Sequence, residues 1–252
     1  MTNKITIKNC NIINEGNIFE SDLLIENGRI SKINSSIEAQ GDVIDASGLY
    51  LMPGIIDDQV HFREPGLTER GNIKSESLSA IAGGTTSFMD MPNVLPPTLN
   101  LDLWKEKISI AEQNASANFS FYMGTSNTNI DEIKAINPKE VCGIKIFMGA
   151  STGNLLVDNE DSLNALFRES PVIITTHCED TPMIKDLEEK YLDEYGPKIP
   201  VDMHAEIRSR ECCLKSSKKA VELAEKHNSN LHILHITTED EISLFSNKPI
   251  KE

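Results

Sequence analysis

The feature that most restricts the fold of this chain is an alternation of apolar strands and helices that begins at Pro53. Six short apolar runs after this residue have strand character, and segments with helical periodicity or helix-start signals separate them. Repeated β–α units predict parallel strands joined by right-handed crossovers. Because no G-x-G-x-x-G motif opens a helix, the pattern favours a β/α barrel over an open dinucleotide-binding sheet.

The first part of the chain follows a different pattern. Residues 1–52 contain short apolar runs separated by turns, and Asn27-Gly28 between two of them is a strong hairpin signal. We therefore expect two domains: the N-terminal part of a small β-sandwich over 1–52, and an α/β barrel over 53–252. A closed TIM-type (β/α)8 barrel needs about eight strands. About six βα units predict an incomplete barrel, so we expect this chain to be the N-terminal portion of a longer protein.

Composition excludes several classes of partner. Acidic residues outnumber basic ones 39 to 24, which argues against nucleic acid as the main partner. The sequence has no apolar run of transmembrane length, no basic cluster for a membrane surface and no secretory signal at its start. Its five cysteines form no C-x-x-C pair, which is typical of free thiols in a reducing compartment. We expect a cytoplasmic protein with neither a membrane nor a nucleic-acid partner.

Four polar residues lie two apart along one short segment: Asp57, Gln59, His61 and Arg63. Because an extended strand sends every second side chain to the same side, an acid, an amide, an imidazole and a guanidinium would project into one space. Polar groups are costly to bury without partners. A metal ion and an anionic ligand are the natural partners for such a set.

Further polar residues occupy the ends of later predicted strands, where the active sites of β/α barrels gather. Asp90 and then Asn93 follow the second strand, and Lys145 lies on the fourth. A single histidine at a strand end is usually a satisfied polar group, but several at matching strand ends are hard to explain in that way. The pattern predicts a metal site built from His61, Lys145, His177 and His235.

Side-chain alternation refines this prediction. On the sixth strand, Ile233 and His235 would share a face, so we expect His232 on the other face, packed against helices. Lys145 has two interpretations that the sequence leaves open. It could pair with a carboxylate; alternatively, burial would lower its pKa, and the neutral amine would react with carbon dioxide to give an anionic carbamate that bridges two metals.

The order of these motifs resembles a known family. The segments PGIIDDQVHFREPG, FMDMPN, GIKIFMG, THCED and LHILHITT are similar to those of dihydroorotases of the amidohydrolase superfamily, from about residue 4 to the end. HFREPG is the most specific of them, because hydantoinases, dihydropyrimidinases and allantoinases usually lack this arginine. The resemblance implies a zinc-dependent, reversible interconversion of N-carbamoyl-L-aspartate and L-dihydroorotate in pyrimidine biosynthesis, with one or two Zn²⁺ per subunit. It also implies a small-molecule substrate and a homodimer.

The resemblance also implies residue roles. His61 corresponds to a metal ligand, Lys145 to the lysine that is carbamylated in many members, and His177 and His235 to two imidazole ligands of the second metal. The expected binders of the substrate carboxylate are Arg63 and Asn93.

The chain departs from the family at two points. Gln59 stands where the family usually has the first histidine of His-x-His, and an amide is a poorer zinc ligand, so the number of metals stays open. The family's catalytic aspartate, which ligates metal and moves the proton, is expected beyond Glu252. We therefore expect no catalytic residue within this chain and no activity of the chain alone.

Two other functions stay open at this point. A related cyclic amidohydrolase, such as an allantoinase or hydantoinase, would use the same metal ligands. A non-catalytic dihydroorotase-like scaffold would explain the loss of a histidine at Gln59, although scaffolding would not require the four retained metal-binding residues.

Overall fold

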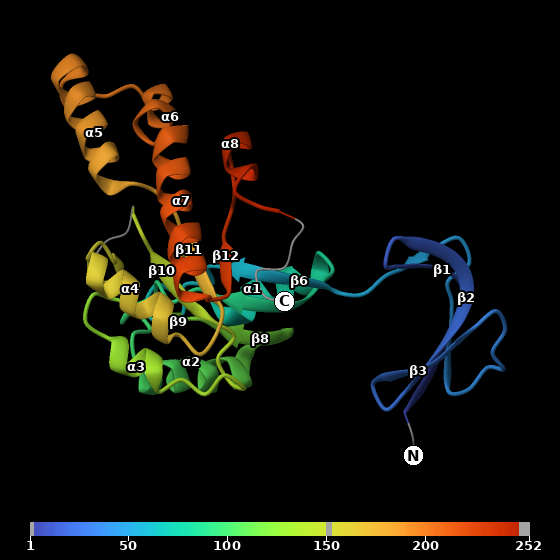
Figure 1. Ribbon diagram of the computed structural model, residues 1–252. Coiled ribbons are helices and arrows are strands. Elements are labelled where there is room, and N and C mark those ends of the chain that lie inside the picture. The colour runs from blue at the N-terminus through green and yellow to red at the C-terminus, as the bar shows by residue number, and fades with distance from the viewer. Residues whose placement is uncertain (1–2, 150–152, 247–252) are drawn as a thin grey trace. The chain divides into compact units, whose positions relative to one another are not determined.

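The computed structural model describes residues 3–149 and 153–246, and the chain divides into two compact units, Met1–Ile55 and Ile56–Glu252 (Figure 1). The first unit is a five-stranded sheet in the order β3-β2-β1-β4, with β5 also paired to β1. Its strands are β1 (Lys4–Asn14), β2 (Asn17–Glu26), β3 (Arg29–Asn34), β4 (Asp42–Asp45) and β5 (Tyr50–Leu51).

Two antiparallel hairpins start this sheet, and β4 and β5 then run parallel to β1. Between β2 and β3, Asn27 and Gly28 have φ of 52° and 75°, which is the pair of positive values that a type I′ turn requires. The hairpin predicted from Asn27-Gly28 is therefore confirmed. Small and aliphatic side chains on one face form the core of the unit: Cys10, Ile12, Leu23 and Ala46.

The second unit holds a parallel sheet interleaved with helices. Its strands are β6 (Ile55–Val60), β7 (Thr85–Asp90), β8 (Asn118–Phe121), β9 (Met123–Gly124), β10 (Ile144–Phe147), β11 (Ile174–His177) and β12 (Leu231–Ile233). They form two ladders, β6-β7-β8 and β12-β11-β10-β9. Tyr122 alone separates β8 from β9: its N–H donates to Asp90 O at 3.1 Å, and the next N–H, of Met123, donates to Gly143 O at 3.1 Å. The two ladders therefore continue one another in chain order.

Helices follow most strands, and their starts are set by polar caps. They are α1 (Ile73–Ala82), α2 (Leu101–Asn114), α3 (Ile130–Lys134), α4 (Glu160–Glu169), α5 (Thr181–Tyr195), α6 (His204–Ile207), α7 (Arg210–His227) and α8 (Glu239–Ile242). Asn100 and Asn159 cap α2 and α4, because each side chain accepts a hydrogen bond from the backbone of the first turn. Helix α5 ends at Tyr195, and Gly196 follows with φ 65°.

The main core lies between the sheet and its helices. The side chains that do not pack into this core project from the opposite face of the sheet. Ile144, Ile146, Ile174 and Ile233 belong to this core. Alternate residues on the same strands, including Lys145 and His177, therefore project to the opposite face of the sheet. That face carries the candidate site.

The expectation for His232 is wrong. Ile233 packs in the helix-side core, whereas the His232 ring lies on the opposite face, with Nδ1 3.5 Å from Asp58 Oδ2. The expectation placed Ile233 and His235 on one face of a continuous strand. In fact β12 ends at Ile233, and His235 has φ 42°, so alternation does not extend to it.

Candidate active site

The ends of β6 and β7 bring His61, Arg63 and Asn93 together. His61 Nδ1 lies 2.8 Å from Asn93 Oδ1, and Arg63 Nη1 lies 3.5 Å from the Asn93 carbonyl oxygen. With Nδ1 donating to the amide oxygen, Nε2 of a neutral ring keeps its lone pair for a metal. Burial and the charge of Arg63 lower the pKa of His61, which favours this neutral form. The expected metal ligand and the expected substrate binders are thus neighbours.

A buried ion pair holds this corner in place. Asp90 Oδ1 accepts from the backbone N–H groups of Phe62 at 3.0 Å and Met91 at 2.9 Å, and its Oδ2 pairs with Lys107 Nζ at 2.8 Å. Lys107 also donates to Met91 O at 2.8 Å. Asp90 therefore holds the backbone of Phe62, the residue between His61 and Arg63, and its role is structural. Sequence reasoning noticed Asp90 as a strand-end acid but missed Lys107, which comes from α2.

Replacing Lys107 with methionine should lower the free energy of unfolding by about 3–5 kcal/mol, because Asp90 would stay buried without its cation. The side chains of Lys107 and Asp90 are 1% and 0% exposed. Urea unfolding of the purified protein measures this loss, and Lys105→Met, at an exposed site on the same helix, is the matched control. Equal stabilities of the two variants would contradict a structural role for the pair.

The loop after His61 depends on a glycine. Gly66 has φ 81°, and a Cβ there would overlap the carbonyl oxygen of Leu95. The N–H of Leu95 donates to Pro65 O at 3.1 Å, and Glu64 Oε2 accepts from the N–H of Ile73 at 2.8 Å. The REPG segment is therefore clamped between α1 and the loop that carries Asn93, which explains its fixed arrangement beside His61.

Lys145 lies on β10 and is 1% exposed. Within the described residues its Nζ has no hydrogen bond or ion pair, and it lies 4.8 Å from the centre of the Phe147 ring. Burial lowers the pKa of Lys145 to about 7, so a substantial share of the amine is neutral at neutral pH. In the described part of the chain no carboxylate pairs with Lys145, as the first interpretation would require.

The ends of β11 and β12 bring two imidazoles together. His177 Nδ1 lies 3.1 Å from His235 Nε2. Burial, followed by the charges of His177 and Lys145, lowers the pKa of His235 to about 4, so its ring is neutral at neutral pH. Two nitrogens bound to one tetrahedral zinc at about 2.0–2.1 Å lie about 3.3 Å apart. The pair therefore has nearly the spacing that one zinc ion requires.

The histidines of the site lie in two groups, one with His61 and one with His177 and His235, and Lys145 interacts electrostatically with both groups. The positive charge of Lys145 lowers the pKa of His61 as well as that of His235, so the amine is within electrostatic reach of both rings. Gln59 is half-buried on β6. Among residues 3–149 and 153–246, no three His, Cys, Asp or Glu side chains converge on one point. Lys145, as a carbamate, would supply the oxygen donors that the histidines lack.

Two further residues at the site were missed by sequence reasoning. Glu179 Oε2 lies 2.6 Å from His177 Nε2, and Arg208 contacts both oxygens of that carboxylate. A cavity of about 170 Å³ lies beside them and is also lined by His235. The THCED motif contains Glu179, but nothing in the sequence connects it to Arg208, which lies 29 residues further on.

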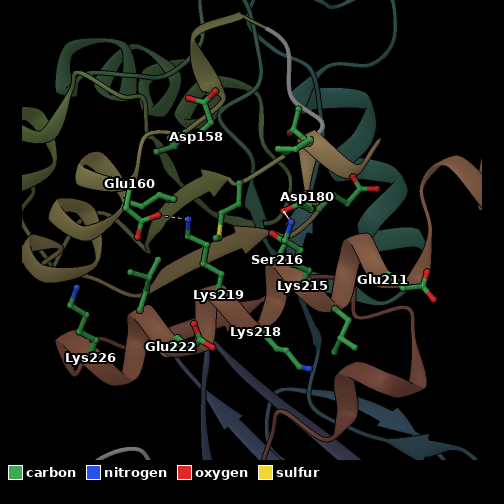
Figure 2. Close-up of a pocket in the computed structure, with 18 residues that line it drawn as sticks. Asp158, Glu160, Asp180, Glu211, Lys215, Ser216, Lys218, Lys219, Glu222 and Lys226 are labelled. Carbon is green, nitrogen blue, oxygen red and sulfur yellow. Dashed lines mark hydrogen bonds and ion pairs between the residues drawn. The ribbon is translucent and has the colours of Figure 1, made fainter. Parts of the chain in front are cut away.

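A larger cavity, of about 840 Å³, lies elsewhere, between α4, α7 and the start of α5 (Figure 2). Its four lysines come from α7, and two of them form ion pairs: Lys219 with Glu160, and Lys215 with Asp180 at 3.0 Å. Glu179 lines it, but His61, Lys145, His177 and His235 do not. Size alone therefore does not identify the site in this protein.

Comparison with known proteins supports a cyclic amidohydrolase. The chain is 31% identical to a dihydroorotase of Methanosarcina acetivorans over 95% of its own length and 51% of that protein's length. It is 30% identical to an L-hydantoinase of Paenarthrobacter aurescens, covering 95% and 54% of the two chains. An allantoinase of Bacillus velezensis is 28% identical over 94% of this chain and 53% of its own. The chain thus spans about half the length of the curated relatives it matches.

The fold agrees with these relationships. The structure of an L-hydantoinase (dihydropyrimidinase) from Arthrobacter aurescens matches with a TM-score of 0.89 and 28% identity, over 97% of this chain and 55% of that one. This confirms the predicted α/β barrel class with its N-terminal β unit. No protein-family model matches the chain. Of the helices in the described part of the chain, none has the length and apolar character needed to cross a bilayer. The chain is similar, over about half of their length, to cyclic amidohydrolases of the amidohydrolase superfamily that include a dihydroorotase, an L-hydantoinase and an allantoinase.

Proposed function

We propose that the protein to which this chain belongs is a zinc-dependent dihydroorotase, which interconverts L-dihydroorotate and N-carbamoyl-L-aspartate. The observation that carries this proposal is the contact of Arg63 with Asn93 next to His61. L-Dihydroorotate carries a carboxylate that hydantoin lacks, and a guanidinium is the side chain best suited to bind one. The similarity to a dihydroorotase over 95% of the chain supports the same choice.

The residues present fit a divalent metal. His177 and His235 have nearly the spacing of two zinc ligands, and His61 keeps Nε2 free for a metal. Lys145 is buried without a described anionic partner, which suits conversion to a carbamate. When bound, such a metal lowers the pKa of a water molecule to about 7 and polarises the carbonyl of the ring amide. Gln59 would contribute at most a weak ligand.

The protein's own groups have separate tasks. The neutral amine of Lys145 attacks the carbon of carbon dioxide; a nitrogen–carbon bond forms, one carbon–oxygen π bond opens to an oxyanion, and the amine loses a proton to solvent. Arg63 binds the substrate carboxylate through two parallel hydrogen bonds and so holds the ring in one orientation. Asn93 orients the His61 ring by accepting from Nδ1 and offers its amide nitrogen to the substrate. His177 and His235 remain ligands throughout.

A hydantoinase is the second candidate. The L-hydantoinase matches in sequence at 30% identity, and the L-hydantoinase structure has a TM-score of 0.89, so similarity alone does not separate the two activities. The deciding experiment supplies the complete protein with Zn²⁺ and measures the hydrolysis of L-dihydroorotate, hydantoin and allantoin side by side. We expect the highest kcat/KM for L-dihydroorotate. A higher value for hydantoin or allantoin would contradict the proposal and select the corresponding alternative.

A further inference from the structure

The geometry points to Glu179 and Arg208 as positioning residues that hold the His177 ring so that its Nδ1 faces a divalent metal. This inference rests on the metal-dependent function proposed above. Neither residue was among the expected ligands. Both lie outside the set that would touch the metal or the substrate, and both act through His177.

Glu179 is tied to His177 on one side and to Arg208 on the other. The Glu179 residue is only 7% exposed. Its Oε2 lies 2.6 Å from His177 Nε2, its Oε1 accepts from Arg208 Nε at 2.7 Å, and Arg208 Nη2 also contacts Oε2. Both oxygens of the buried carboxylate therefore have a partner. A buried carboxylate that stays ionised needs such partners.

This contact decides which nitrogen of His177 can bind a metal. A carboxylate only accepts hydrogen bonds, so Nε2 keeps its proton and Nδ1 is the nitrogen that offers a lone pair. Nδ1 is also the nitrogen that lies 3.1 Å from His235 Nε2. The two rings meet edge to face, with centres 4.9 Å apart. Metal-binding histidines commonly use a carboxylate at the second ring nitrogen in this way.

The backbone leaves Glu179 little freedom to move. A Cβ on Gly149 would overlap the carbonyl oxygen of Glu179, so the loop after β10 lies directly against it. The next residue, Asp180, donates its N–H to Cys212 O at 3.1 Å and pairs with Lys215 Nζ at 3.0 Å. The end of β11 is therefore wedged between that loop and α7.

Arg208 comes from a different part of the unit. It follows α6 directly and precedes Ser209, whose side chain caps α7. The α5–α6 segment has a small core of its own, formed with the first turn of α7 by Ile184, Ile207 and Cys212. Arg208 thus connects this separately packed segment to the strand end that carries His177. An arginine suits this task because its planar fork reaches both oxygens of one carboxylate.

The test uses the complete protein, with zinc affinity as the readout. Zn²⁺ binding is measured by competition with a coloured chelator for wild type, Glu179→Gln, Arg208→Gln and Arg208→Lys. Arg210→Gln is the matched control, because Arg210 lies two residues away in an exposed pair with Asp240 at 2.6 Å. We expect zinc affinity to fall about 10- to 100-fold in Glu179→Gln and Arg208→Gln. The zinc affinity of Arg208→Lys, which keeps the charge but loses the planar guanidinium, should lie between that of these variants and that of wild type. The zinc affinity of Arg210→Gln should match wild type.

Two further measurements separate positioning from general stability. Thermal unfolding of the metal-free proteins reports folding, and the visible spectrum of the Co²⁺-loaded proteins reports the ligand geometry. We expect a changed Co²⁺ spectrum in Glu179→Gln and Arg208→Gln. If these variants do not fold, ¹⁵N NMR of the zinc-loaded wild type still decides, since His177 should bind through Nδ1 and keep a proton on Nε2.

Each other outcome contradicts the inference. Unchanged zinc affinity and an unchanged Co²⁺ spectrum in both variants would show that the Glu179–Arg208 pair does not position His177. An equal loss in Arg210→Gln would show a general effect of weakening α7. Coordination of wild-type His177 through Nε2 would exclude the proposed orientation. If wild type binds no zinc at all, this inference and the proposed function both fail. If wild type binds zinc but the variants bind it equally well, only this inference fails.

Discussion

Replacing Lys145 with alanine in the complete protein should reduce kcat by about 10³-fold or more. The side chain is buried on β10 without a described anionic partner, and its pKa is lowered to about 7. As a carbamate it would supply the anionic oxygens that the histidines of the site cannot. Loss of metal-based charge stabilisation is worth several kcal/mol, which corresponds to this change in rate. Steady-state hydrolysis of L-dihydroorotate at saturating Zn²⁺ measures it.

The control for this prediction is Lys139→Ala, which removes an exposed lysine from the segment just before β10. It should leave kcat unchanged. A carboxylic acid small enough to enter the vacated space, such as formate, should partly restore activity to Lys145→Ala, because it replaces the carbamate oxygens. Wild-type mass spectrometry under non-denaturing conditions should show the added mass of carbon dioxide. Full activity of Lys145→Ala would contradict the assignment.

Replacing Arg63 with alanine should lower kcat/KM for L-dihydroorotate by about 10²- to 10³-fold. A pair of charge-assisted hydrogen bonds to a carboxylate is worth about 3–4 kcal/mol in total, because each contributes about 1.5–3 kcal/mol and the two are not fully additive. Hydantoin lacks the carboxylate, so its hydrolysis by Arg63→Ala should change little. The ratio of the two kcat/KM values is therefore the informative measurement.

Arg70→Ala is the control for Arg63→Ala, because Arg70 belongs to the same loop and its side chain is 65% exposed. Equal losses on both substrates would mean that Arg63 supports the loop rather than the carboxylate. That result would remove the main reason to prefer a dihydroorotase over a hydantoinase. Arg63→Lys should recover part of the loss, since the charge remains while the planar fork is lost.

The sequence was sufficient for the features that depend on local patterns. Alternation along β6, β10 and β11 correctly separates Val60, Ile144 and Ile174, which pack toward helices, from the polar residues on the other face. The Asn27-Gly28 turn is equally local. These features depend on a strand period of two and on the positive φ of a tight turn, both of which can be read over a few residues.

Features that depend on three-dimensional neighbours were not predictable. The φ of 42° at His235 turns its ring toward His177, and no local signal announces a left-handed histidine. The same limit explains the wrong face expected for His232. Lys107 pairs with Asp90, and Arg208 with Glu179, across distances in the chain that only the folded arrangement of α2, α6 and the strand ends explains.

The central claim is that the ends of β11 and β12 hold a divalent metal between His177 and His235. The most direct test is an anomalous difference map, recorded at the zinc absorption edge from crystals of the complete protein grown with Zn²⁺. The account predicts a peak about 2.0–2.1 Å from both His177 Nδ1 and His235 Nε2. A map with no peak between these two rings, or with zinc bound only elsewhere, would contradict it.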